Sequence, residues 1–146
     1  MNFSNATYEE VNEVIEKLLE IDSTNLAHES IRGNRISSEL NKIYIQVSRE
    51  LMKVTDQKNA VELQRYKYYS GKLPAEAYRK EPLDTAVLKT DIPSYMSNDK
   101  VVIEIRNIYK EKEMIVKLVE DARSSLKSRT YDIKNSIEFT KFMSGN

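Results

Sequence analysis

The sequence predicts an all-α protein whose long amphipathic helices form a helical hairpin or coiled-coil-like subunit that oligomerises. Three observations predict this class. The 146 residues include only three Gly and three Pro, and 32% of them are charged, a composition that favours long helices. Apolar residues recur at alternating steps of three and four in two long stretches. Each stretch gives a narrow apolar seam, and such a seam requires a partner helix.

A first helix is predicted from about Tyr8 to Ile21. Thr7 and Glu10 have the spacing of a capping box. The apolar stripe that follows at helical spacing consists of Tyr8, Val11, Val14, Ile15, Leu18 and Leu19. A row of glutamates covers the opposite face, which favours a solvated surface; contact with a basic partner or a neighbouring subunit is the alternative. The polar residues 22–25 favour a turn, so a new helix should begin at Leu26.

The second helix is expected to run from about residue 26 to residue 69. Gly33 and Asn34 form a weak point that could kink or split it. Its seam consists of Ile36, Leu40, Ile43, Val47, Leu51, Val54 and Val61, with one interruption at Lys58. Gly71 is well placed to adopt the left-handed conformation that ends a helix.

An irregular, partly extended connection is predicted over residues 70–99, because this stretch holds all three prolines. A short helical turn could follow Pro74, and residues 85–90 could be extended. A connection of about thirty residues is long for a compact domain, so we expect a packed arm that could reach a neighbouring subunit.

A third long helix is predicted over residues 100–142. Its seam consists of Val101, Ile105, Ile108, Ile115, Val119, Ala122, Leu126, Ile133 and Ile137, with interruptions at Lys112 and Arg129. The length of the chain predicts a single helical domain over residues 1–146.

The composition argues against an enzyme. The chain has no Cys and one histidine, His28, which is best interpreted as an ordinary surface or packing residue. A Gly-rich phosphate loop and paired metal-ligand motifs are also absent, so no catalytic residue, metal or cofactor is predicted. No secretion signal precedes the first helix, and no stretch approaches the roughly 20 apolar residues that span a bilayer. The sequence therefore predicts a soluble cytoplasmic protein with no membrane partner.

The charge is unevenly distributed, although the formal net charge is zero. Residues 1–30 carry seven acidic residues and one lysine, whereas residues 49–80 carry eight basic and four acidic residues. An acidic end and a basic middle suggest either an anionic partner or charge-directed self-assembly.

The end of the second helix is the best candidate for a binding site. The cations of this region could contact phosphates, and Tyr66 and the two tyrosines after it could stack on unpaired bases, as in single-strand binders. The predicted DNA-binding residues are Lys58, Arg65, Lys67, Tyr68, Tyr69 and Lys72. The alternative is that the tyrosines pack under the following loop and Gly71 is a plain C-cap.

A second basic run, with secondary DNA-binding candidates, lies on the third long helix. Arg123, Lys127 and Lys134 share one helical face, whereas Arg129 falls near the seam. A solvated surface is the alternative interpretation of this run.

Several short matches, in order along the chain, resemble one known family. They are Ile21-Asp22-Ser23-Thr24 ahead of Leu26, Gln57-Lys58, Arg65 followed by Tyr68-Tyr69-Ser70-Gly71, and Lys127-Ser128-Arg129 with Ile133-Lys134. Together they resemble the UvsY family of recombination mediators from T4-like phages, over most of the chain.

The resemblance implies a helical protein of the phage-infected bacterial cytoplasm that assembles as a ring, a hexamer or heptamer, and binds single-stranded DNA. It also implies that the protein loads a UvsX-type recombinase onto DNA covered by the phage single-strand-binding protein. A Lys-x-Arg pair before the tyrosines is linked to DNA binding in that family. Arg65 matches its arginine, but Leu63 stands at the lysine position, where Lys67 or Lys58 could substitute.

The resemblance also ties the C-terminal segment to self-assembly. The predicted oligomerisation residues are Leu126, Ile133, Ile137 and Phe142. The rival interpretation is a non-enzymatic coiled-coil structural or adaptor protein that binds no nucleic acid. An anionic-membrane binder would need a helix with one strongly basic and one large aromatic or leucine face, and no predicted helix has both.

Overall fold

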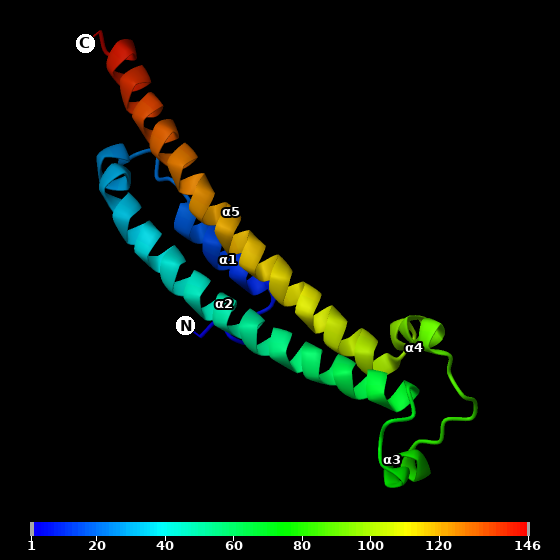
Figure 1. The fold of residues 1–146 in the computed structure, drawn as a ribbon. Helices are drawn as coiled ribbons and strands as arrows, with labels where there is room; N and C mark the ends of the chain where they lie inside the picture. Colours follow the sequence, from blue (N-terminus) through cyan, green and yellow to red (C-terminus); the bar gives the residue numbers. More distant parts are fainter. Residues whose placement is uncertain (1, 146) are drawn as a thin grey trace. The chain divides into compact units, whose positions relative to one another are not determined.

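A computed structural model describes residues 2–145, and within them the regular structure is helical, with no β-strand (Figure 1). The elements are α1 (Tyr8–Leu19), α2 (Leu26–Tyr69), α3 (Ala75–Lys80), the 3₁₀ helix η1 (Lys89–Asp91), α4 (Ile92–Ser97) and α5 (Lys100–Met143). The prediction of an all-α protein is confirmed.

The chain divides into two compact units. A terminal unit contains residues 2–50 and 113–145, and a middle unit contains residues 51–112. Both long helices, α2 and α5, contribute a segment to each unit. The expectation of a single domain therefore stays a prediction.

The capping box predicted at the start of α1 is present. The Thr7 hydroxyl accepts from Glu10 N at 3.2 Å, and Thr7 N donates to the Glu10 carboxylate at 2.9 Å. Val11 and Ile15 of this helix are buried in the terminal unit. The helix ends at Leu19, two residues earlier than predicted, because the backbone of Glu20 leaves the helical region.

Helix α2 is continuous, so Gly33 does not break it. Most of its predicted seam is buried: Ile36, Leu40, Ile43 and Val47 in the terminal unit and Val54 in the middle unit. The helix ends as predicted, because Gly71 has a φ of 74°. Lys72 N donates to Lys67 O at 3.0 Å and Gly71 N to Tyr68 O at 3.2 Å, the bonds of a Schellman motif.

Helix α5 buries Ile115, Val119, Ala122 and Ile133 along its predicted seam. The seam predicted for its first turns is wrong: Val101 is 50% exposed and the adjacent Val102 is fully buried. Here α5 presents Arg106 and Tyr109 to polar partners on α2, so the packed face is not the one that apolar spacing selects.

The long helices run antiparallel within each unit. In the terminal unit Glu29 contacts Arg129 and Tyr44 contacts Arg123. In the middle unit Lys58 contacts Tyr109, and Glu62 contacts Arg106. In both units, moving forward along α2 therefore means moving backward along α5.

The connection between α2 and α5 contains two short helices. Helix α3 follows Pro74, where a helical turn was predicted, whereas α4, with Pro93 in its first turn, was not predicted. Residues 85–88 form no strand, and η1 covers the end of the stretch that was expected to be extended. Among residues 2–145, no helix combines the length and the apolar character needed to cross a membrane.

Candidate nucleic-acid interface

Arg65, near the end of α2, lies at the centre of a polar cluster and its side chain is only 15% exposed. Its Nε donates to Asp99 Oδ2 at 2.8 Å, and its Nη2 lies 2.7 Å from the same oxygen. Nη1 and Nη2 also donate to the Glu81 carboxylate at 2.9 and 3.0 Å. The bonds to Glu81 raise the pKa of Arg65 despite its partial burial. One guanidinium thus faces two carboxylates, and the cluster has a formal charge of −1.

Asp99 is both a partner of Arg65 and the N-cap of α5. Its Oδ1 accepts from the backbone N–H groups of Val101 and Val102 at 2.9 and 3.2 Å. The Tyr69 hydroxyl donates to its Oδ2 at 2.6 Å. Burial alone would raise the pKa of Asp99, but the bonds from Tyr69, Val102 and Arg65 outweigh it and lower the pKa. The carboxylate therefore fixes the end of α2 to the start of α5.

Tyr68 is 4% exposed, so its ring does not offer the free face that stacking on an unpaired base requires. Its ring stacks on Tyr78 of α3, with centroids 5.4 Å apart and planes 20° apart. Its hydroxyl donates toward the carbonyl oxygens of Glu81 and Pro82 at 3.1 and 3.2 Å. The Arg65 guanidinium covers the ring at 4.3 Å. Tyr68 therefore packs under the following loop, as the alternative interpretation expected.

Two other aromatic rings near the end of α2 are better exposed. Tyr66 and Tyr69 are half-buried, and the Tyr69 ring lies 5.6 Å from that of Tyr95 on α4. Tyr95 is 43% exposed and was not among the predicted site residues. Sequence spacing could not find it, because only the fold of the connection brings α4 to the end of α2.

Lys58 belongs to a second polar cluster in the middle unit. Glu62 accepts from Arg106 Nε at 2.7 Å and lies 3.6 Å from Lys58 Nζ, which also sits over the Tyr109 ring at 4.9 Å. Bonding to Arg106 lowers the pKa of Glu62. Two cations share one carboxylate, so this cluster has a formal charge of +1, opposite in sign to that around Arg65.

Four exposed cations of the middle unit lie where α2 ends and on α3. Lys67 and Lys72 are exposed, and neither takes part in an ion pair within residues 2–145. Arg79 and Lys80 on α3 are also exposed, and Lys80 forms an ion pair with Glu76 at 3.9 Å. The two α3 cations were not among the predicted site residues, although they adjoin the basic segment.

The second basic run is split by burial. Lys127 and Lys134 are exposed, and Arg123 lies over the Tyr44 ring at 4.5 Å. Arg129 is instead buried, with 6% exposure, and is bonded to Glu29. Its guanidinium is therefore not part of the surface that its neighbours share.

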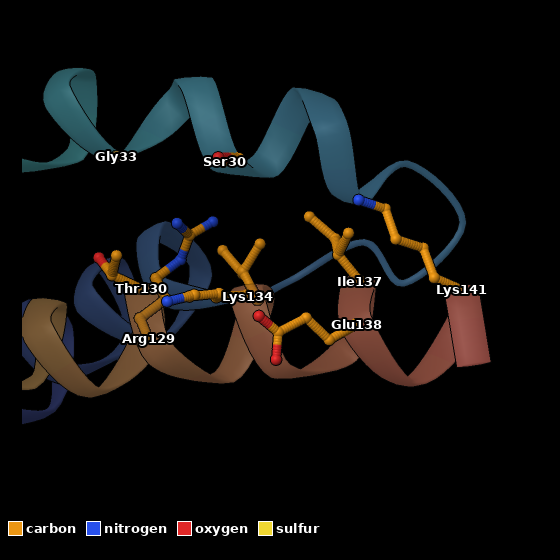
Figure 2. Close-up of a pocket in the computed structure, with 9 residues that line it drawn as sticks. Ser30, Gly33, Arg129, Thr130, Lys134, Ile137, Glu138 and Lys141 are labelled. Carbon is orange, nitrogen blue, oxygen red and sulfur yellow. The ribbon is translucent and has the colours of Figure 1, made fainter. Parts of the chain in front are cut away.

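A pocket of about 430 Å³ lies beside Arg129 in the terminal unit. Figure 2 shows Ile137 and Lys141 of α5 on one side and Ser30 and Gly33 of α2 on the other. The pocket is lined by Ser30, Gly33, Arg129, Thr130, Ile133, Lys134, Ile137, Glu138 and Lys141. It is open because two small residues of α2 face the isoleucines.

The four predicted oligomerisation residues differ in exposure. Ile133 is buried and Leu126 and Ile137 are half-buried, so these three contribute to packing within the terminal unit. Phe142 is 78% exposed and the nearby Phe139 is 65% exposed. Their role in assembly stays a prediction.

Together, fold and site define an all-helical protein with a basic, partly aromatic surface at the end of a long helix. No group of acidic and histidine residues suited to a metal ion occurs within residues 2–145. The family model described as "Recombination, repair and ssDNA binding protein UvsY" matches residues 14–146, so the chain belongs to the UvsY family.

Individual relatives agree with this assignment. The recombination protein uvsY of Enterobacteria phage T4 is 23% identical over 137 residues, which cover 94% of this chain and 97% of the relative. A crystal structure of the bacteriophage T4 recombination mediator protein UvsY, lattice type II, has a TM-score of 0.81 at 23% identity, covering 93% of this chain and 96% of that chain. In lattice type I the TM-score is 0.75 at 22% identity, with coverages of 91% and 98%. These structures share the fold.

Proposed function

We propose that this protein is a recombination mediator without catalytic activity. It binds single-stranded DNA in the cytoplasm of the bacterial host and helps a UvsX-type recombinase load onto DNA covered by the phage single-strand-binding protein. The observation that carries the proposal is the pair Lys67 and Lys72, which are exposed, have no ion-pair partner among residues 2–145 and lie beside half-exposed tyrosines. Membership of the UvsY family supports it.

The proposed contacts follow from exposure and charge. Lys67 and Lys72 contact phosphates, and Lys58 contributes from a cluster that keeps a positive charge. Tyr66 and Tyr69 offer ring faces on which unpaired bases stack, worth about 1–3 kcal/mol per base and tolerant of sequence. Such a site suits a protein that must engage any stretch of single strand.

Self-assembly would multiply this weak site. In the proposed ring, a hexamer or heptamer, one engaged subunit brings the next to the strand at high effective concentration. The exposed Phe139 and Phe142 supply apolar surface for such an assembly. The exposed Arg123, Lys127 and Lys134 are secondary candidates for DNA contact, whereas the buried Arg129 is assigned to the interior.

The test is fluorescence anisotropy of a labelled single-stranded oligonucleotide over a range of salt concentrations, with duplex of the same sequence as comparison. The slope of log K against log salt is negative, and each lost phosphate contact reduces its magnitude by about 0.7 for a single strand. Lys67→Ala/Lys72→Ala removes two contacts and should therefore reduce the magnitude of the slope by about 1.4 per bound subunit. The matched control is Lys42→Ala/Lys117→Ala, which removes two exposed lysines of the terminal unit.

The rival function is a coiled-coil adaptor that binds no nucleic acid. It predicts no anisotropy change at low salt for a protein whose mass shows normal assembly. That result would overturn the proposal. Equal losses in the two double variants would also count against it, because they would indicate a diffuse effect of net charge.

A further inference from the structure

Arg65 has little capacity left for a phosphate. Three of its five N–H donors are used in hydrogen bonds to Asp99 and Glu81, and Nη2 also lies 2.7 Å from Asp99 Oδ2. Its single positive charge faces two carboxylates, whose pKa values are both lowered, so both are ionised at neutral pH. A phosphate approaching this cluster would meet a net negative charge, which is unfavourable.

The same cluster fastens α3 to the end of α2. Arg65 holds Glu81, the residue that directly follows α3. Tyr78 of α3 stacks on Tyr68, and its hydroxyl donates to the Tyr68 carbonyl at 2.7 Å. A helix of six residues is far below the roughly 12 to 15 that give even marginal stability in water, so these contacts hold it in place.

Fastening α3 places two more cations at this end of α2. Arg79 and Lys80 directly follow Tyr78, and both are exposed. With Lys67 and Lys72, they give the middle unit four exposed cations on the end of α2 and the helix held against it. The four cations that reach solvent are thus different residues from Arg65, which holds α3 in place.

We propose that α3 is part of the DNA-binding surface, with Arg79 and Lys80 contacting phosphates of the single strand. Arg65 is a positioning residue that fastens α3 and does not itself touch DNA. The inference rests on the proposed binding of single-stranded DNA, and extends it to residues outside the basic end of α2.

The binding test uses the full-length assembled protein and the labelled single strand. Arg79→Ala/Lys80→Ala should reduce the magnitude of the slope of log K against log salt by about 1.4 per bound subunit, since each contact contributes about 0.7. The matched control is Arg35→Ala/Lys42→Ala, which also removes one exposed arginine and one exposed lysine, from α2 in the terminal unit. Equal effects of the two double variants would overturn the assignment of α3 to the interface.

A double-mutant cycle separates positioning from contact at Arg65. Arg65→Gln should weaken binding in the wild type but add no further loss in the Arg79→Ala/Lys80→Ala background. If Arg65 contacted a phosphate directly, Arg65→Gln would instead reduce the magnitude of the salt slope by about 0.7 in both backgrounds. That result would overturn the positioning role.

A second variant breaks the fastening without changing Arg65. Glu81→Gln should speed amide hydrogen exchange in α3 while leaving the interior of α2 protected, and should weaken DNA binding. If Arg65 contacted DNA, releasing it from Glu81 would strengthen binding, which would contradict the proposal. Because exchange is measured without DNA, unchanged exchange in α3 rejects the fastening, whereas failure of the wild type to bind DNA rejects the proposed function.

Discussion

Glu29 and Arg129, one hundred residues apart in the chain, form an ion pair inside the terminal unit, with 5% and 6% of their side chains exposed. Arg129 Nη1 also donates to the Glu29 carbonyl at 3.2 Å. A second arginine, Arg32, shares the carboxylate at 3.0 Å and donates to Glu20 O at 2.7 Å. One carboxylate therefore compensates two guanidiniums. As a result, Glu29 and Arg129 differ in how much their removal should destabilise the protein.

We expect removal of Glu29 to cost more stability than removal of Arg129. Glu29→Gln leaves the buried Arg129 without its counter-charge, a change that typically costs about 3–5 kcal/mol. Arg129→Met leaves Glu29 bonded to Arg32, so the loss should be nearer 1 kcal/mol. Urea denaturation at one fixed protein concentration measures both.

The double variant Glu29→Gln/Arg129→Met supplies the control. It removes the uncompensated guanidinium and should recover part of the loss seen in Glu29→Gln alone. Equal losses in the two single variants would contradict the unequal roles, and would indicate that Arg32 contributes little to the pair.

A second prediction concerns Gly33, in the interior of α2. A Cβ added there would meet nothing within 4 Å, and the residue does not have a positive φ. Gly33→Ala should therefore stabilise the protein by about 0.5–1 kcal/mol, since Gly lowers helix stability by that amount relative to Ala. Thermal and urea unfolding would show it. If Gly33→Ala were instead less stable than the wild type and formed an assembly of smaller mass, the result would show that another group occupies the adjoining pocket.

The long helices were predictable because their signals are local and repeated. The seam from Ile36 to Val54 and the glycine C-cap at Gly71 each follow from spacing or backbone preference within one element. At Val101 and Val102, one residue apart and equally apolar, spacing alone chose the wrong face, because polar partners on α2 decide the packing there.

The partners of Arg65 could not be predicted in the same way. Glu81 and Asp99 lie 16 and 34 residues further along an irregular connection, and no period links them to α2. The basic and aromatic composition of the segment indicated a surface, but burial of Tyr68 depends on where Tyr78 folds back. Which members of a cationic cluster reach solvent is a tertiary property.

A third prediction separates the two tasks of Asp99. Asp99→Asn keeps a side chain that can cap α5 but loses the charge that pairs with Arg65, whereas Asp99→Ala loses both. A lost N-cap costs about 1 kcal/mol and a hydrogen bond to a charged group about 1.5–3 kcal/mol. Asp99→Ala should therefore be less stable than Asp99→Asn by about 1 kcal/mol. Identical urea midpoints would show that the cap contributes nothing.

The last prediction is that acid weakens the middle unit through the carboxylates around Arg65. Bonding to Arg65 lowers the pKa of Glu81 below its ordinary 4.5, and the Tyr69, Val102 and Arg65 bonds lower that of Asp99 below 3.8. The unfolded chain thus binds protons at a higher pH than the folded one. The stabilisation is complete above the unfolded pKa values and is lost as pH falls through the folded ones.

Hydrogen exchange in α3 and the first turn of α5 should therefore accelerate as the pH falls below the unfolded pKa values of these carboxyls, after correction for the intrinsic pH dependence of exchange. Asp99→Asn removes one of the titrating groups, so the corrected acceleration should be smaller in that variant, although the variant is less stable at neutral pH. A corrected acid response of the same size in wild type and variant would mean that Asp99 does not carry it. It would then have to arise from Glu81 or from Glu62, whose pKa is lowered by Arg106.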